Sequence, residues 1–324
     1  MSTPSDAVPL DEYQELPRPA TTWLVDQFIS ASGITNLFSA PKVGKSFLAL
    51  DLARAVSQGE PSWLNQTILR QAKVLYVQLD TPRSLWSERI AKLREAGISF
   101  DTNDITPETP RACHYFLIAD MEQAPYPFNV HDPECVAWLQ GQINKHQPEL
   151  VIIDTLREVH DLDEDKATPM KSVLTALRAA TMPKEGSPPA LLIISHSRKS
   201  NPKFDGGLMD EGRGANYVAG RSDVVCRMLA KEGADTCRMI YRGRNTGHEV
   251  KILQRNPKTI LWELKDDPMA AAKARWKADV EFIARNPDHA KKTLTERGRL
   301  LNALHTDKRL ETCIAAIRRH KVKV

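Results

Sequence analysis

Apolar runs that alternate with helical patterns constrain the fold of this chain more than any other feature. The runs read GITNLFSA, AKVLYVQLD, RACHYFLIAD, ELVIIDTL and PALLIISHS, and segments with helical spacing of apolar residues separate them. Strands that are apolar throughout belong to a parallel sheet covered on both faces. The alternation therefore predicts an α/β fold with a mostly parallel central sheet and right-handed crossovers.

Residues that typically start and stop helices support this interpretation. KSFLALDLARAVSQG ends at Gly59, and PRSLWSERIAKLREAG ends at Gly97. In PECVAWLQGQINKHQP, Pro133 lies near the start, where a helix tolerates proline. For TPMKSVLTALRAAT we expect Thr168 to be the N-cap and Pro169 to occupy the first turn.

The second half of the chain changes character twice. After PALLIISHS comes a polar, Gly-rich stretch that predicts a long loop, followed by GRSDVVCRMLA, TCRMIYRGRN, EVKILQR and TILWEL. These short segments predict an antiparallel extension at the edge of the sheet. A basic helical unit then begins, with Asp267 as cap and Pro268 in the first position. We expect a flexible N-terminal lead-in over 1–17, an α/β domain over 18–265 and a small helical C-terminal subdomain over 266–324.

Charge and composition narrow the class of protein. Residues 268–324 carry 14 Lys and Arg against 6 Asp and Glu, a net charge of +8, which leaves −4 for the rest of a chain whose net charge is +4. A basic tail favours a polyanionic or protein partner.

No run reaches the roughly 20 apolar residues of a membrane helix. The acidic, Pro-rich N-terminus lacks the features of a signal peptide, so a cytoplasmic location is expected. The five scattered cysteines form no C-x-x-C pair.

The segment SAPKVGKS, residues 39–46, predicts a phosphate-binding loop. It matches G-x-x-x-x-G-K-[ST] with Ser39 in place of the first glycine, after a predicted strand and before a predicted helix. Backbone N–H groups and the helix dipole favour an anion there. Lys45 would contact the β and γ phosphates of ATP, and the Ser46 hydroxyl would ligate Mg²⁺. The predicted nucleotide-binding residues are Ser39, Ala40, Pro41, Lys42, Val43, Gly44, Lys45, Ser46 and Phe47.

Polar residues at the ends of three apolar strands complete the predicted site. Asp154 ends LVIID and is expected to hold the magnesium ion, while a strand-end cap is the alternative. Asp80 ends YVQLD and is the candidate catalytic base, although it could also cap the following helix. His196 ends LLIISH and is the candidate sensor of the γ-phosphate, with a structural role as the alternative.

Collinear motifs resemble the RepA-like branch of the RecA-type ATPases, whose known members include hexameric replicative helicases. The matching stretches are PKVGKSFLALDLA, YVQLD, LVIIDTLREVHDLDEDKATPM, LLIISHSRK, GRGANYVAGRSDVV and YRGRN, within about residues 18–262. The resemblance implies a RecA-like core, ATP with Mg²⁺, and a ring in which a neighbour completes each site. The trans cation would be Arg213 or Arg244, the latter on a strand at the edge facing the neighbour. Relatives usually have Glu where this chain has Asp80, which predicts slower hydrolysis.

The resemblance also assigns two loops to a central channel, about residues 157–168 and 197–216. The second carries the candidate nucleic-acid contacts Arg198, Lys199 and Lys203, whereas the first contains the acidic DLDEDK. One hypothesis is therefore a ring-forming ATPase motor on single-stranded DNA, a replicative helicase of a plasmid, phage or other mobile element. The alternative is a slow regulatory or assembly ATPase that recruits a protein partner through the basic tail. A small-molecule kinase fits less well, because no lid segment is recognisable.

Overall fold

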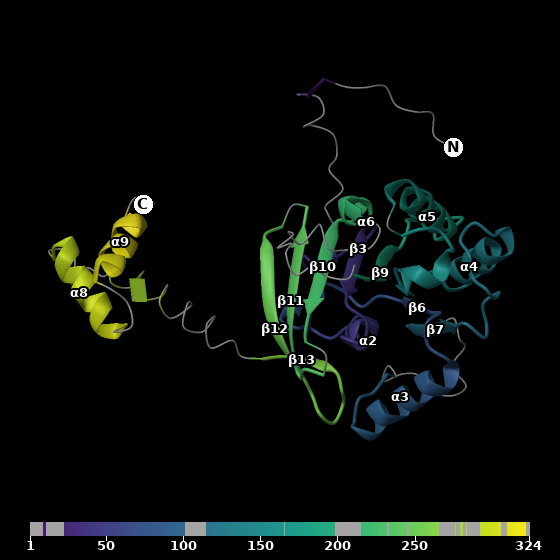
Figure 1. Ribbon diagram of the computed structural model, residues 1–324, viewed down its shortest axis with the longest axis horizontal. Coiled ribbons are helices and arrows are strands. Elements are labelled where there is room, and N and C mark those ends of the chain that lie inside the picture. The colour runs from purple at the N-terminus through teal and green to yellow at the C-terminus, as the bar shows by residue number, and fades with distance from the viewer. Residues whose placement is uncertain are drawn as a thin grey trace. The chain divides into compact units, whose positions relative to one another are not determined.

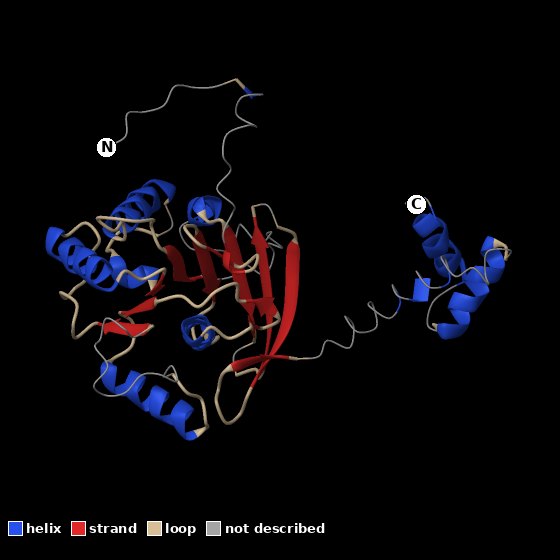
Figure 2. Cartoon of the chain, turned by 180° about the vertical axis from the view of Figure 1, so that it is seen from behind, coloured by secondary structure: helices blue, strands red, loops and turns tan. Residues whose placement is uncertain are grey.

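The computed structural model describes residues 9–10, 23–100, 115–164, 166–197, 215–231, 233–244, 246–265, 276, 279–280, 283, 292–305 and 310–321. The chain divides into two compact units, Met1–Leu264 and Lys265–Val324 (Figure 1). The first unit is a large sheet with helices on both of its faces (Figure 2). The N-terminal lead-in predicted over 1–17 lies almost wholly outside the described residues, and the predicted domain boundaries stay predictions.

In the described part of the chain, a nine-stranded sheet forms the centre of the first unit, with the order β13-β12-β11-β10-β3-β9-β8-β6-β7. Neighbouring strands from β7 to β10 pair in parallel, and β11, β12 and β13 continue the sheet in antiparallel pairing. The predicted α/β class with a mostly parallel sheet is thus confirmed. The strands are β3 (Ile34–Ser39), β6 (Val74–Gln78), β7 (Phe116–Asp120), β8 (Leu150–Asp154), β9 (Ala190–His196), β10 (Val224–Leu229), β11 (Thr236–Gly243), β12 (His248–Arg255) and β13 (Trp262–Leu264).

Two expectations about the extension were wrong. The segment GRSDVVCRMLA was expected to belong to the antiparallel extension, yet its strand β10 pairs in parallel with β3 on one side and antiparallel with β11 on the other. The strand that contains YRG, β11, was expected at the sheet edge, yet it lies between β10 and β12. The reason is that β12 and β13 add further antiparallel strands outside it and move the edge away.

The helices of the first unit cover the two faces of this sheet. One face packs α2 (Lys45–Gln58) and α3 (Arg83–Glu95) over apolar residues that include Tyr76 and Ile152. The other face packs α4 (Pro133–His146) and α5 (Ala167–Ala180) over residues that include Val77 and Ile153. The remaining described elements of this unit are α6 (Ala215–Arg221), the 3₁₀ helix η2 (Leu156–Val159), and the short strands β1 (Trp23–Val25), β2 (Ile29–Ser30), β4 (Ser62–Trp63) and β5 (Gln66–Thr67).

The helix ends follow the sequence signals in most places. Gly59 ends α2 in a left-handed conformation with φ of 66°, and the Asp132 side chain caps α4 immediately before Pro133. The predicted cap of α5 was wrong. That helix begins at Ala167 after Lys166, so Thr168 lies inside the first turn and does not cap it.

The second unit contains the helices α8 (Leu294–Leu304) and α9 (Leu310–Lys321). A reciprocal capping box between Thr293 and Glu296 starts α8. Leu301 and Cys313 are buried in its small apolar core. The residues expected to start this unit, Asp267 and Pro268, lie outside the described residues.

Among the helices that the structure describes, none has the length and apolar character required to cross a membrane.

Candidate nucleotide site

The phosphate loop connects the end of β3 to the start of α2. Lys42 and Gly44 have left-handed backbones, with φ of 62° and 101°. Ser39 instead ends β3 in regular register with His196. Because only positive φ strongly favours glycine, serine is accommodated at position 39 without backbone strain. The departure from the usual motif therefore leaves the loop geometry intact.

Lys45 is the first residue of α2, and its side chain is held at the ends of two neighbouring strands. Its ammonium donates to the carbonyl oxygen of Ser39 at 3.3 Å, to the Ser39 hydroxyl at 3.2 Å and to the Ala40 carbonyl at 3.3 Å. The residue is only 5% exposed. Burial lowers the pKa of Lys45 to about 8, against the charges of Asp154 and Asp80, which raise it. A buried cation in this place suits an anionic ligand.

Asp154 ends β8 as a fully buried acid. The Tyr76 hydroxyl donates to its Oδ2 at 2.7 Å, while Oδ1 is buried and has no hydrogen-bond partner among the described residues. Burial raises the pKa of Asp154, whereas the hydrogen bonds from Tyr76 and Ser46 lower it. A buried carboxylate oxygen beside a hydroxyl fits Mg²⁺, a hard cation that takes one or two carboxylates together with phosphate oxygens. Ser46 and Asp154 are thus the residues that would hold it.

His196 approaches the phosphate loop from the end of β9. Its Nδ1 lies 3.3 Å from the Lys45 ammonium. An ammonium group has only hydrogens to offer, so Nδ1 accepts this bond and the ring proton is on Nε2. The structure therefore brings together the predicted lysine, the predicted metal-holding acid and the predicted sensor at the carboxyl ends of adjacent strands.

Asp80 follows β6 and is exposed. The preceding residue is fixed to the metal-holding strand, because Leu79 N–H donates to the Asp154 carbonyl at 2.8 Å. The negative charge of Asp80 contributes to raising the pKa of Asp154 and to raising that of Glu158. Asp80 thus lies within electrostatic range of the site, as expected for a base that acts on a water near the phosphates.

Arg89 on α3 is a cation near these acids that sequence reasoning missed. Its guanidinium lies 4.5 Å from the ring centre of Phe47 and 5.0 Å from that of Trp86. Burial lowers the pKa of Arg89, and the negative charges of Asp154 and Asp80 oppose this shift. Its position nine residues after Asp80, on the helix that follows that strand, was the available signal.

Sequence reasoning also missed a pair of hydrogen bonds that hold the phosphate loop, here called the brace. The Trp262 indole N–H donates to the Gly44 carbonyl at 3.2 Å, and Arg255 donates to the Val43 carbonyl at 3.3 Å. A β-carbon added at Gly44 would lie 2.7 Å from Arg255 Nη2 and 2.8 Å from Trp262 Nε1. Glycine is therefore required here both by its backbone angle and by this close approach. More than 200 residues separate the partners, so no local pattern could reveal the contact.

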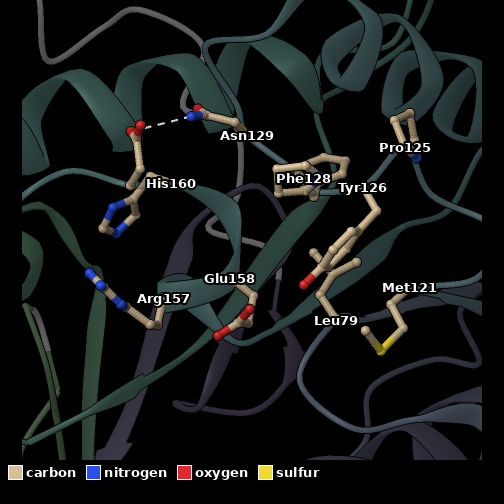
Figure 3. A pocket seen from close by; sticks show the side chains of 11 residues that line it. Leu79, Met121, Pro125, Tyr126, Phe128, Asn129, Arg157, Glu158 and His160 are labelled. Atoms are coloured by element: carbon tan, nitrogen blue, oxygen red, sulfur yellow. Dashed lines mark hydrogen bonds between the residues drawn. The ribbon is translucent and has the colours of Figure 1, made fainter.

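A pocket of about 170 Å³ is lined by Leu79, the residue before Asp80 in the chain (Figure 3). Its walls include Tyr126, Arg157 and Glu158. His160 is buried, and burial lowers its pKa to about 4, so the ring is neutral at physiological pH. The first predicted channel loop begins in the 3₁₀ helix η2, which is joined to the segment before α4 because Val130 N–H donates to the Val159 carbonyl at 2.9 Å.

The remaining predicted site residues fall into two groups. Arg244 follows β11 and is 54% exposed at its side chain. Its backbone N–H donates to the Asp223 carbonyl, and Asp223 in turn binds Ile34 at the start of β3. Arg244 therefore lies beside the start of β3, whereas the phosphate loop follows the end of β3, so Arg244 does not reach the site of its own chain. Arg213, Arg198, Lys199 and Lys203 lie outside the described residues and stay predictions.

Comparison with known proteins agrees with this architecture. The chain matches the AAA_25 family, an AAA domain, over residues 2–202. A solved ATPase domain superposes with a TM-score of 0.53 at 11% identity, covering 81% of this chain and 100% of that one. A DnaB-like replicative helicase superposes with a TM-score of 0.52 at 10% identity, covering 78% of this chain and 66% of that one, just under two thirds of its length. Among curated proteins, none matches this chain.

The sheet order, the loop between β3 and α2 and the polar strand ends together give the P-loop α/β fold that these two solved structures share. The chain belongs to the AAA_25 family. The resemblance stated from the motifs is thereby confirmed at the level of fold and family.

Proposed function

We propose that this chain is an ATP-hydrolysing motor that forms a hexameric ring and acts on single-stranded DNA, as the replicative helicase of a plasmid, phage or other mobile element. The observation that carries the ATPase part is the meeting of Lys45, Asp154 and His196 at one edge of the sheet. The fold shared with a DnaB-like replicative helicase, which interacts with primase, supports the nucleic-acid part.

In this proposal each residue has a distinct task. Lys45 binds the β and γ phosphate oxygens with its ammonium group. Asp80 accepts the proton of the attacking water, and its shorter side chain limits how closely it approaches that water. Bound at Ser46 and Asp154, magnesium would neutralise the charge of the phosphates. His196 donates from Nε2 to a γ-phosphate oxygen while Nδ1 holds Lys45, which couples the sensor to the loop.

The position of Arg244 supports the proposed ring. The phosphate loop is at one end of β3, and Arg244 is beside the other end, about 17 Å of strand away. A chain with complementary sites at the two ends of its parallel strands can contact its copies head to tail, and such contacts form a ring when the rotation between neighbours closes. Arg244, or Arg213 beyond the described residues, would then supply the trans cation. The basic C-terminal unit would contact DNA or a protein partner.

Steady-state ATP hydrolysis with and without single-stranded DNA tests this proposal, with Lys45→Ala as control. We expect DNA to stimulate hydrolysis at least about tenfold, and the control to abolish both rates. Slow hydrolysis that is indifferent to DNA would overturn the motor. It would favour the regulatory or assembly ATPase, for which Asp80 in place of glutamate and the exposed acids Asp161 and Asp163 are the supporting observations.

A further inference from the structure

Gln78, the last residue of β6, has a side chain to which the protein offers no hydrogen bond. The residue is 0% exposed, and neither Nε2 nor Oε1 of its amide has a hydrogen-bond partner among the described residues. Buried polar groups in native proteins are nearly always hydrogen-bonded, because an unpaired one destabilises the fold. A fully buried amide with two unpaired atoms therefore indicates a partner from outside the chain, such as an ordered water.

The neighbours of Gln78 show on which side that partner would lie. On one side Gln78 pairs with Asp120 of β7, whose carboxylate already binds the Arg83 guanidinium at 2.6 and 2.7 Å. On the other side it pairs with Asp154 of β8. Oδ1 of Asp154 is likewise buried and unpaired within the described part of the chain. The unpaired atoms thus belong to residues that face each other across two neighbouring strands.

Gln78 and Asp154 also share a face of the sheet. Side chains alternate along a strand, and Tyr76 and Ile152, two residues before them, both belong to the apolar core beneath α2 and α3. From this face the Tyr76 hydroxyl binds Asp154 Oδ2 at 2.7 Å, and the Ser46 side chain also hydrogen-bonds Asp154. The amide of Gln78 is therefore on the face where Ser46 and Asp154 would hold magnesium.

We propose that Gln78 is a positioning residue of this metal site, an inference that rests on the ATP-binding function proposed above. Mg²⁺ sheds its waters reluctantly and usually keeps several of them in a protein site. Each such water has hydrogens to donate, and Oε1 of Gln78 is an acceptor for one beside Asp154, while Nε2 can donate to a further water. Groups that orient the ligands of a metal in this way commonly change its affinity by about 10- to 100-fold.

The exposure of Gln78 separates its task from that of Asp80. Asp80 is exposed and follows the strand, so it can meet a water that enters with the nucleotide from solvent. Gln78 is enclosed on all sides and can act only through groups held inside the site. It is therefore expected to affect how tightly the metal and its nucleotide are held, and not to take up a proton.

Calorimetric titration of the full chain with ADP tests the proposal in three buffers, which contain Mg²⁺, Ca²⁺ or EDTA. Gln78→Met keeps an unbranched side chain of similar length and removes both polar atoms. We expect it to weaken ADP binding at least about tenfold with Mg²⁺, about threefold or less with Ca²⁺, and less than about twofold in EDTA. Ca²⁺ is the informative comparison, because it readily takes amide carbonyls as direct ligands, whereas Mg²⁺ retains its waters.

Thermal unfolding without ligand gives a readout that a merely structural role would move in the opposite direction. Gln78→Met should leave Tm unchanged or raise it, because it removes two buried atoms that have no partner among the described residues. Asn36→Leu is the matched control, since Asn36 is a similarly buried amide on β3 whose Oδ1 accepts from the Ser195 hydroxyl at 2.8 Å. It should lower Tm and leave ADP affinity with Mg²⁺ within about twofold of wild type.

A second variant keeps the proposal testable if Gln78→Met does not fold. Gln78→Asn retains the amide but withdraws it by one methylene, and it should weaken ADP binding about threefold with Mg²⁺ and not in EDTA. Equal losses with Mg²⁺ and in EDTA would assign Gln78 a structural role. A loss with Ca²⁺ as large as that with Mg²⁺ would make it a direct metal ligand, and no loss in any buffer would remove it from the site. If wild-type protein binds ADP in none of the buffers, the proposed ATP-binding function itself fails, which the other outcomes do not imply.

Discussion

The two flanks of the phosphate loop are built in different ways. On the flank of β6, β8 and β9, parallel strands end in polar residues, and Asp154 and His196 reach the site directly. On the flank of β10 to β13, the pairing turns antiparallel, and Arg255 and Trp262 donate hydrogen bonds to carbonyl groups of the loop backbone. The first flank thus supplies chemical groups, and the second fixes the shape of the loop. Loss of a residue should affect the rate on one flank and affinity on the other.

Of the predicted variants, Asp154→Asn should show the largest effect and test the role of the first flank. We expect the hydrolysis rate to fall at least about a hundredfold, because the charge that would hold magnesium is lost. Stability should not fall, since burial raises the pKa of Asp154 and a neutral amide removes the cost of the buried charge. Steady-state kinetics and thermal unfolding measure the two effects.

A matched control is available on β7, which is the second strand from β8 in the sheet. Asp120 is the last residue of β7 and pairs with Gln78, the last residue of β6. It binds Arg83 instead of the phosphate loop. Asp120→Asn should leave the hydrolysis rate within about threefold of wild type. A comparable loss in both variants would mean that acids at the sheet edge act only through stability.

The pH dependence of nucleotide binding should give an intermediate effect. The pKa of Lys45 is lowered to about 8, mainly by burial, so the ammonium loses its charge as pH rises through 8. Since phosphates bind the charged form, the Kd of ADP should rise about tenfold between pH 7 and pH 9. Lys45→Arg stays charged over this range and should give a weaker but flat profile. If calorimetry gives the same pH dependence of the ADP Kd for wild type and for Lys45→Arg, a group other than Lys45 causes that dependence.

Loss of the brace should give the smallest effect, and this effect should be on ADP affinity and not on the hydrolysis rate. Trp262→Phe removes the donor to the Gly44 carbonyl, and we expect ADP affinity to fall about fivefold with little change in kcat. Trp63→Phe is the matched control, because Trp63 is equally buried and donates to Asp51 on α2, away from the loop. Both variants should lose about 1 to 3 kcal/mol of stability. Equal affinity losses would refute the brace.

The parts of the site that could be predicted share one physical property. SAPKVGKS, Asp80, Asp154 and His196 each follow an apolar run, and strand ends in a parallel sheet converge on one edge. A strand pattern alone thus places them together. The confirmed fold class follows from the same runs, whereas their roles in catalysis stay predictions.

The parts that could not be predicted depend on contacts between distant segments. Tyr76 reads as one more apolar strand residue, yet its hydroxyl binds Asp154, 78 residues away. Arg255 and Trp262 read as an ordinary antiparallel pair until the loop is seen beside them. The cap at Thr168 was wrong because α5 starts one residue before it, and helix ends often vary by a residue or two.

The contacts of Lys45 have a consequence for how long a nucleotide stays bound. The ammonium has three hydrogens, and the chain offers it four acceptors within 3.3 Å, including the Ser39 hydroxyl that a glycine would lack. A phosphate oxygen must therefore compete with the protein for each hydrogen it takes. When phosphate binds at this loop, Lys45 exchanges hydrogen bonds within the protein for hydrogen bonds to phosphate. The net free energy of binding is therefore a difference between two contributions of similar size. Such a site favours rapid release of product over long retention of nucleotide.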